Sequence, residues 1–152
     1  MSDEEWRAAA SLRFQVSIDG GNAKDLGDWT KCDGLSVQYD VYEYKEGGEN
    51  SYVHRIPGRA SYQNVKLSRT IDGYSTPENT GKSVAAWLSS LATEVKRHTA
   101  EISLVDLEVK KIAGWKLQGV YPVRWSGPSL DAGSATMAME TLELAHDGFL
   151  EV

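Results

Sequence analysis

The amino-acid sequence predicts a mainly β protein: an antiparallel β-barrel or sandwich with one amphipathic α-helix and a long extended hairpin. Three observations lead to this prediction. Apolar and polar residues alternate in several short segments, which is the pattern of a strand with one buried face. One segment, Lys82–Val95, repeats its apolar residues at helical spacing. Two further strands flank a polar Gly-Gly tip within residues 35–56.

The length and composition fit one globular domain. The chain has 152 residues, 41% of them hydrophobic and 25% charged, so we expect a single domain over residues 1–152. Residues 1–12 are polar and rich in alanine, and we expect a flexible N-terminal tail there. The net charge of −6 argues against a phosphate-binding surface, because nucleic-acid affinity comes mainly from lysine and arginine.

The N-terminal half begins with a half-buried strand. Phe14, Val16 and Ile18 alternate with polar residues, and a turn follows. Residues 23–33 look irregular, with Leu26 and Trp29 as anchors. A further strand is expected over Asn64–Thr70, with Val65, Leu67 and Arg69 on one face.

The hairpin between these strands is longer than barrel closure requires. Its first strand alternates from Leu35 to Val41, and the phase then slips at Tyr42, which predicts a bulge. Its second strand covers Ser51–Ile56 and is expected to end at Pro57-Gly58. Tyrosine and arginine are favoured at interfaces, so we expect this hairpin to contact other subunits. The expected contact residues are Tyr42, Tyr44, Lys45, Glu46, Gly47, Gly48, Glu49, Asn50 and Tyr52.

The C-terminal half contains the helix and the remaining strands. The apolar stripe of the helix is formed by Val84, Trp87, Leu88, Leu91 and Val95. A strand over Ala100–Leu104, a turn at Asp106–Glu108 and a return strand over Val109–Leu117 follow. The stretch Gly114–Leu150 then reads as two strands around a turn-rich corner. The first ends in Tyr121–Trp125, and the second runs from about Ala135 to His146.

No arrangement of residues selects a reaction. Gly81-Lys82-Ser83 lacks the first glycine of a phosphate-binding loop. The three histidines have no ligand partners at metal-binding spacing, and Cys32 has no evident base nearby in the sequence. The sequence therefore predicts a protein that is not an enzyme, with no catalytic residues, no cofactor and no metal.

Several segments together resemble one protein family. They are FQVSIDG (14–20), CDGLSVQYDVYEYKE (32–46), IPGRASYQNVKL (56–67), Trp87-Leu88 of the helix, GWKL (114–117), YPVRWSGPSLDA (121–132) and METLELAHDGFL (139–150). Their order resembles the tail tube family of contractile phage tails and phage-like contractile injection systems, which is related in fold to the type VI secretion tube protein. The similarity runs over almost the whole chain from about Leu12 onward.

The resemblance implies a tail-tube fold and a structural role. Six subunits would form a ring with a continuous inner β-barrel, and rings would stack into a hollow tube. A contractile sheath would drive that tube through a target envelope. The implied partners are further copies of the chain, sheath protein, and baseplate and spike proteins, with cargo or DNA in the lumen.

By analogy with this family, strands within Leu35–Ile56, Trp115–Trp125 and Ala135–His146 would line the lumen. Their small and polar positions would face water; the competing arrangement places the opposite face of either strand in the lumen. The lumen-facing candidates are Ser36, Gln38, Thr136, Glu140 and Thr141.

The cellular location of the protein and an alternative function are inferred from its N-terminal charges and its aromatic residues. The N-terminus carries acids where a signal peptide needs basic residues, so we expect a protein made in the cytoplasm without a signal peptide. It would then be assembled into a phage tail, as a virion component, or into a phage-like injection particle. The alternative is a small-ligand-binding β-barrel module, whose pocket the abundant tryptophan and tyrosine would line.

Overall fold

The structure is a computed structural model, and it describes residues 12–19, 25–48, 50–70, 80–128, 133 and 138–150. Most of the predicted tail (residues 1–11), Glu49 and Thr136 lie outside these residues. The strands are β1 (Arg13–Ile18), β2 (Asp25–Trp29), β3 (Lys31–Asp33), β4 (Val37–Tyr44), β5 (His54–Tyr62), β6 (Val65–Thr70), β7 (His98–Val105), β8 (Lys111–Ser126), β9 (Met139–Ala145) and β10 (Gly148–Leu150). The helix is α2 (Thr80–Leu91).

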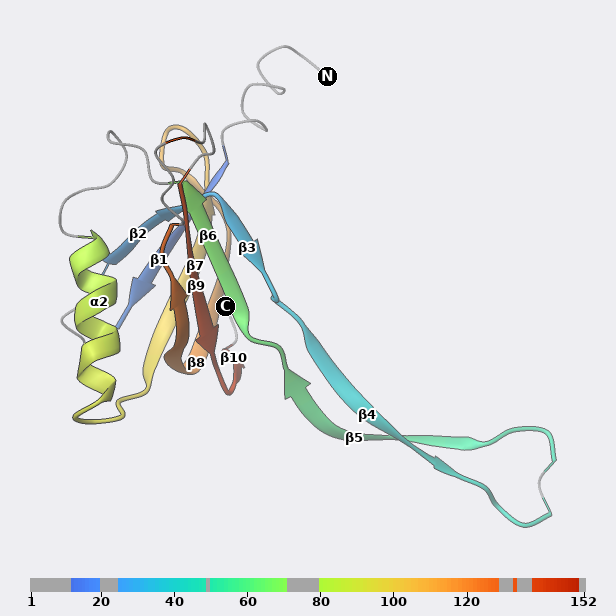
Figure 1. The fold of residues 1–152 in the computed structure, drawn as a ribbon. Helices are drawn as coiled ribbons and strands as arrows, with labels where there is room; N and C mark the ends of the chain where they lie inside the picture. The colour runs from blue at the N-terminus through green and yellow to red at the C-terminus, as the bar shows by residue number, and fades with distance from the viewer. Residues whose placement is uncertain are drawn as a thin grey trace, which may run out of the picture.

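The strands form an antiparallel sandwich from which the β4–β5 hairpin projects (Figure 1). The strand order is β2-β1-β7-β8-β9-β6-β3, and β8 belongs to both layers because its first half pairs with β7 and its second half with β9. We call β2, β1, β7, the first half of β8 and β10 sheet 1, and the second half of β8 with β9, β6 and β3 sheet 2. The predicted fold class is therefore confirmed as a sandwich rather than a closed barrel.

The core lies between the two sheets. Alternation places one face of each strand inward, so Val16 and Ile102 of sheet 1 meet Leu67 and Leu142 of sheet 2, all of them fully buried. Burying a side chain of this size contributes about 1.5–3 kcal/mol. Further core residues are Ile18, Leu26, Trp29, Val65, Val84, Trp87, Ala100, Leu117, Val120 and Leu144.

The segment predicted to be irregular is two short strands. Leu26 and Trp29 are fully buried, as expected of anchors, but the chain around them forms β2 and β3. At Thr30 the backbone N–H donates to the carbonyl of Ser68 at 3.0 Å, which links β2 and β3 to β6. The alternation of apolar and polar residues does not reveal these strands, because β2 contains Gly27, with φ 81°, and a glycine contributes no side chain to the alternation.

The helix is shorter than predicted at its C-terminal end. Val84 and Trp87 are buried, and α2 packs against β2. After Leu91 the hydrogen bonding changes from the α-helical to the 3₁₀ type, because the N–H groups of Ala92 and Thr93 donate to carbonyls three residues earlier in the chain. Val95, predicted to belong to the apolar stripe, is therefore beyond the helix and 68% exposed. No helix among the described residues is long and apolar enough to cross a membrane.

Two other predicted boundaries were wrong. Pro57 and Gly58 do not end the hairpin strand, since β5 continues to Tyr62. A two-stranded ribbon tolerates proline because one side of each strand needs no hydrogen bond. The return strand after β7 is longer than expected, because β8 runs without interruption from Lys111 to Ser126.

Candidate functional site

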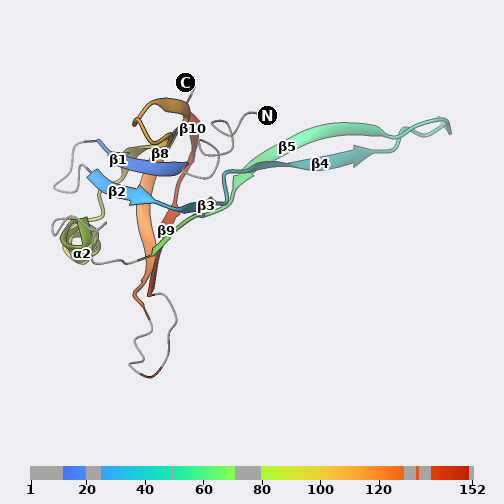
Figure 2. The ribbon, with the colours of Figure 1, turned by 90° about the horizontal axis from the view of Figure 1, so that it is seen from above.

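The β4–β5 hairpin is the most exposed apolar element of the described chain. It leaves the sandwich as a two-stranded ribbon and extends well beyond it (Figures 1 and 2). Every residue of β4 is exposed. The exposed large apolar side chains of the hairpin are Val37, Tyr39, Val41, Tyr42, Tyr44, Tyr52, Val53 and Ile56. An isolated two-stranded hairpin is at best marginally stable, and apolar clusters of this kind mark contact surfaces.

Local packing shapes this ribbon without burying it. A register shift lies beside the predicted slip of phase, between Tyr39 and Val41. There Asp40 of β4 stands opposite both Gly58 and Arg59, so the extra residue belongs to β5. Tyr42 lies across Gly58, where an added Cβ would stand 2.4 Å from the tyrosine ring. Glycine is therefore required at position 58 for the ring to keep this place.

The tip of the hairpin holds a small polar and aromatic cluster. His54 Nε2 lies 3.2 Å from Glu46 Oε2, and the His54 ring meets Tyr52 edge-on at a centroid distance of 4.8 Å. Gly48 has φ 98°, a conformation that glycine adopts at low cost. The predicted contact residues within the described chain, Tyr42, Tyr44, Lys45, Glu46, Gly47, Gly48, Asn50 and Tyr52, are all exposed on this hairpin.

The lumen candidates do not share one face. Thr141 lies on the outer face of sheet 2, where its hydroxyl is 3.4 Å from that of Ser68. Ser36 is half-buried between β3 and β4, and Gln38 is exposed on β4. Glu140 is next to Thr141 in β9, so its side chain points to the opposite side and is only 4% exposed. The expectation that Glu140 faces water is therefore corrected.

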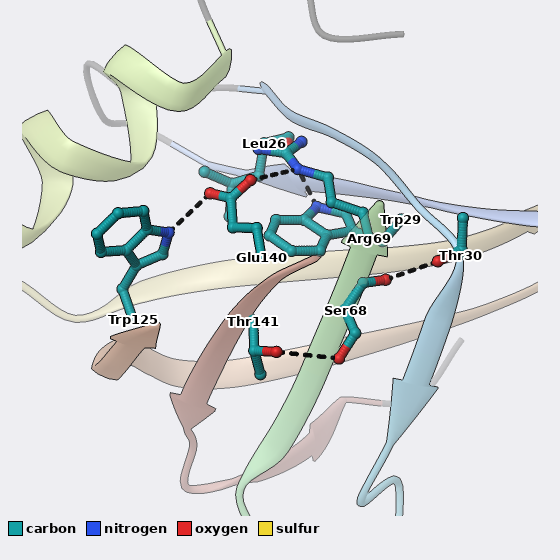
Figure 3. Close-up of polar contacts among 8 residues, drawn as sticks. All are labelled: Leu26, Trp29, Thr30, Ser68, Arg69, Trp125, Glu140 and Thr141. Atoms are coloured by element: carbon teal, nitrogen blue, oxygen red, sulfur yellow. Dashed lines mark hydrogen bonds and ion pairs between the residues drawn. The ribbon is translucent and has the colours of Figure 1, made fainter. Parts of the chain in front are cut away.

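Glu140 belongs to a buried polar network (Figure 3). Arg69 Nε donates to Glu140 Oε2 at 2.7 Å, and the indole N–H of Trp125 donates to Glu140 Oε1 at 2.7 Å. Arg69 Nη1 donates to the carbonyl of Leu26 at 3.2 Å, and its guanidinium lies 4.2 Å from the centroid of the Trp29 ring. This network joins β6, β9, β8 and β2 at one end of the sandwich.

Sequence reasoning missed this network, although one signal was present. Arg69 is in phase with Val65 and Leu67 on the inward face of β6. A buried arginine requires a buried partner, since an unpaired charge in the core is costly. The partner is Glu140, which lies 71 residues away in the sequence, so no local pattern identifies it.

The outer face of sheet 2 is polar and charged. One cross-strand row runs from Asp33 to Lys66, then to Glu143, then to Arg124. The signs therefore alternate across the four strands. A shallow hollow of about 170 Å³ on this face is lined by Lys66, Arg124, Ser126, Thr141 and Glu143. Such a face suits contact with water and with charged groups of either sign.

Sheet 1 has a second open hollow on its outer face. Its volume is about 430 Å³, and Ser17, Ile18, Asp19, Thr99, Glu101, Lys116 and Leu150 line it. A hydrogen bond from Lys111 lowers the pKa of Glu101 and holds that side chain at the rim. The lining residues are mostly polar and charged, whereas small-molecule sites are mostly enclosed and apolar.

Cys32 and the three histidines make local packing and hydrogen-bond contacts and do not gather into one site. Burial, followed by the charge of Asp33, raises the pKa of the Cys32 thiol to about 11. His98 Nδ1 is 3.0 Å from the carbonyl oxygen of Asp19, and His146 Nε2 is 3.1 Å from that of Gln63. Together with His54 at the hairpin tip, the three imidazoles lie in three separate places.

Fold and surface together define a structural subunit: a filled sandwich carrying an apolar arm. The chain belongs to the family described as T4-like virus tail tube protein gp19, which matches residues 10–150. This match bears out the resemblance drawn from the sequence motifs, and with it the structural role. No curated protein matches the chain.

Solved structures with the same fold are also similar to the chain. One is a chain of an extracellular contractile injection system, the PVC sheath–tube complex in its extended state. It has a TM-score of 0.70 and 22% identity over 99% of this chain and 97% of that one. Another belongs to the anti-feeding prophage cap, with a TM-score of 0.69 and 23% identity over 91% and 86%. A type six secretion system protein has a TM-score of 0.50 and 12% identity over 90% and 80%.

Proposed function

We propose that this chain is the repeating subunit of the inner tube of a contractile injection system or phage tail. Six copies form a ring, rings stack into a hollow tube, and sheath contraction drives that tube through a target envelope. The single observation that carries the proposal is the family match over residues 10–150. The fold shared with a chain of the PVC sheath–tube complex supports it further.

The hairpin provides the physical reason for self-association. A ribbon with apolar side chains on both faces loses free energy by burying them, at about 25 cal/mol per Å² of apolar surface. The sandwich carries its own core, so the hairpin surface is left for another molecule. A projecting arm that contacts a different surface on the next copy makes a head-to-tail interface, which closes into a ring when the rotation permits.

The lumen wall in this proposal is the outer face of sheet 2. Thr141 lies on it, Ser36 lies in the link between β3 and β4, Gln38 lies on β4, and Thr136 is retained as a candidate. Ser68 and Ser126, the cross-strand neighbours of Thr141, join this set. Cargo would pass small hydroxyl side chains and charges of alternating sign, and it would meet no apolar surface there to which it could bind.

The test is direct observation of the assembly. Purified protein is concentrated and examined by negative-stain electron microscopy and native mass spectrometry. We expect rings of six and stacked tubes with a central channel. A protein that stays monomeric at high concentration and binds a small ligand, with saturable quenching of its tryptophan fluorescence, would instead support the ligand-binding alternative.

Partner assignment is tested separately with purified sheath and baseplate components from the same gene cluster. Tubes should template sheath assembly around them, whereas the monomeric subunit should not. Sheath that assembles equally well without the tube would argue against this partnership.

A further inference from the structure

The β4–β5 hairpin is joined to the sandwich by two short links (Figures 1 and 2). Residues 34–36 lead from β3 into β4, and Gln63 and Asn64 lead from β5 into β6. The links touch, because an added Cβ at Gly34 would stand 2.1 Å from the backbone oxygen of Asn64. The first link is also sharply bent, since the N–H of Ser36 donates to the carbonyl of Gly34 at 2.8 Å. The direction of the whole hairpin is therefore decided at this narrow base.

Two hydrogen bonds hold the second link to β9 and the turn after it. His146 Nε2 lies 3.1 Å from the carbonyl oxygen of Gln63, and Asn64 Nδ2 donates to Glu143 Oε1 at 3.0 Å. A carbonyl oxygen only accepts, so the hydrogen of this contact is on His146 Nε2. His146 is only 9% exposed, so its bond to Gln63 is largely shielded from competing water.

Three aromatic rings pack together beside the same link. The centroid of the His146 ring is 5.4 Å from that of Tyr62 and 5.3 Å from that of Phe149. The rings of Tyr62 and Phe149 meet edge-on, with 5.8 Å between centroids. These tilted and edge-on arrangements are the ones that aromatic rings favour. Tyr62 is the last residue of β5, whereas Phe149 lies in β10 and packs against the core. The three rings therefore connect the foot of the hairpin to the body of the subunit.

Gly148 allows Tyr62 to come this close. Its φ is 147°, and an added Cβ would stand 3.2 Å from both Cζ and the hydroxyl oxygen of Tyr62. A side chain at this position would meet an unfavourable backbone conformation and a tight contact at once. The turn into β10 is therefore shaped to receive the Tyr62 ring.

We propose that Tyr62, His146 and Phe149 form a latch that fixes the direction of the β4–β5 hairpin in the free subunit, before another copy binds it. Farther out, β4 is exposed along its whole length and pairs with β5 alone, so the latch at the base sets the direction. The latch is a property of the single chain and does not depend on the proposed tube. A binding element that is already in position loses less conformational entropy on association.

A distance measurement between two spin labels tests the latch. The labelled chain carries Cys32→Ser, with Lys45→Cys near the hairpin tip and Glu108→Cys on the turn after β7, two exposed positions. Double electron–electron resonance is recorded below the concentration at which the protein assembles. We expect one narrow distribution of distances. A broad distribution in this chain, whose latch is intact, would overturn the proposal.

Two substitutions in the labelled chain open the latch in different ways. Tyr62→Ala removes the ring at the foot of the hairpin, and His146→Gln removes the imidazole but keeps an N–H donor for Gln63. Each should widen the distance distribution at least about twofold, because ring contacts between hairpin and body are lost. The matched control is Tyr39→Ala, which removes an exposed tyrosine of β4 and should leave the distribution unchanged. Distributions as narrow as that of the control for both latch variants would overturn the proposal.

Thermal unfolding shows that these variants keep the sandwich. Tyr62 and His146 lie outside the core cluster, so we expect both variants to fold. The two variants are independent, and a widened distribution counts only for a chain that unfolds cooperatively. This requirement separates an opened latch from a damaged fold.

The consequence for assembly rests on the proposed tube and is measured separately. If the hairpin of Tyr62→Ala keeps its direction in about one fifth of the molecules, the concentration needed for ring formation should rise about fivefold. Rings formed at the wild-type concentration by a variant with a widened distribution would overturn the role of the latch in assembly. Wild-type protein that forms no ring would overturn the tube, while the distance measurement would still decide the latch.

Discussion

Arg69 and Glu140 form a buried ion pair across β6 and β9, with 2.7 Å between Nε and Oε2. Their side chains are 7% and 5% exposed, and Trp125 and Leu26 supply further hydrogen bonds. The pair ties the ends of several strands together below the outer face of sheet 2. Its stability effects therefore differ from those of the surface ion pairs.

Removing one partner of this pair should destabilise the subunit strongly. Glu140→Ala leaves the arginine charge buried and unpaired, so we expect a loss of about 3–5 kcal/mol in the free energy of unfolding. The joint change Arg69→Met with Glu140→Leu should cost much less, because no charge remains. Urea unfolding of the monomeric protein measures both. The control is Lys31→Ala, which breaks an exposed pair with Asp33 and should cost less than about 1 kcal/mol. Similar losses for Glu140→Ala and Lys31→Ala would contradict this account.

Gly34 should not tolerate a side chain. It lies between β3 and β4 with φ 91°, and an added Cβ would stand 2.1 Å from the backbone oxygen of Asn64. Backbone strain of this kind costs about 1–3 kcal/mol, and the clash adds to it. Gly34→Ala should therefore lower stability and redirect the hairpin, measured by thermal unfolding and by ring formation. Gly47→Ala is the matched control for the thermal unfolding measurement, since nothing within the subunit lies within 4 Å of its Cβ position. Equal changes in the midpoint of thermal unfolding for the two variants would show that the backbone at Gly34 adapts.

Shortening the hairpin tip should separate folding from assembly. Deleting residues 47–50 removes a tip whose described members, Gly47, Gly48 and Asn50, are exposed and lie outside the core cluster, so the midpoint of thermal unfolding should stay within a few degrees. Stacking of rings should be impaired, as seen by electron microscopy and sedimentation. Normal tubes from this variant would show that the hairpin tip is not needed for stacking.

The Cys32 thiol should react slowly in the folded protein. Its pKa is raised to about 11, so at pH 8 the thiol is almost entirely protonated, and the reactive thiolate appears only as the pH rises toward 11. Alkylation by iodoacetamide at pH 8 should be at least about tenfold slower in native protein than in protein unfolded by urea. Mass spectrometry of the labelled fraction gives both rates. Equal rates would mean that the site is open.

The raised pKa also makes a small prediction about stability. A thiol whose pKa is higher folded than unfolded contributes stability that is lost as the pH rises from about 9 toward 11, because the unfolded thiol then ionises and the folded one does not. The free energy of unfolding should fall over that range less steeply in Cys32→Ser than in the wild type. Parallel pH profiles would contradict the assignment.

Much of the fold could be predicted from alternation alone. Val16, Ile102 and Leu67 are inward residues of strands recognised from their period of two, and all are fully buried. Val84 and Trp87 mark a helix from its own period. The family was also recognisable, because its motifs are spread over nearly the whole chain. These features are patterns within short segments, so they can be recognised in a single sequence without knowing which segments meet.

Other features depend on which strands meet. Pro57 and Gly58 look like a strand end, yet β5 continues through them because its neighbour β4 supplies the pairing. Glu140 was expected to face water, but the register of β9 against β6 turns it inward to Arg69. A shift of one residue reverses the face of every side chain in a strand.

The sequence by itself determined the class of the subunit: alternating strands, one amphipathic helix, an overlong tyrosine-rich hairpin and a family signature. Only the tertiary structure decided that Asp33 and Arg124 stand at opposite edges of one sheet and that one edge of Tyr121–Ser126 pairs with no described strand. The physical reason is that periodicity sets which face of a strand is buried, whereas pairing across long separations sets its neighbours. Neighbours decide which backbone groups are satisfied and which are left for another copy.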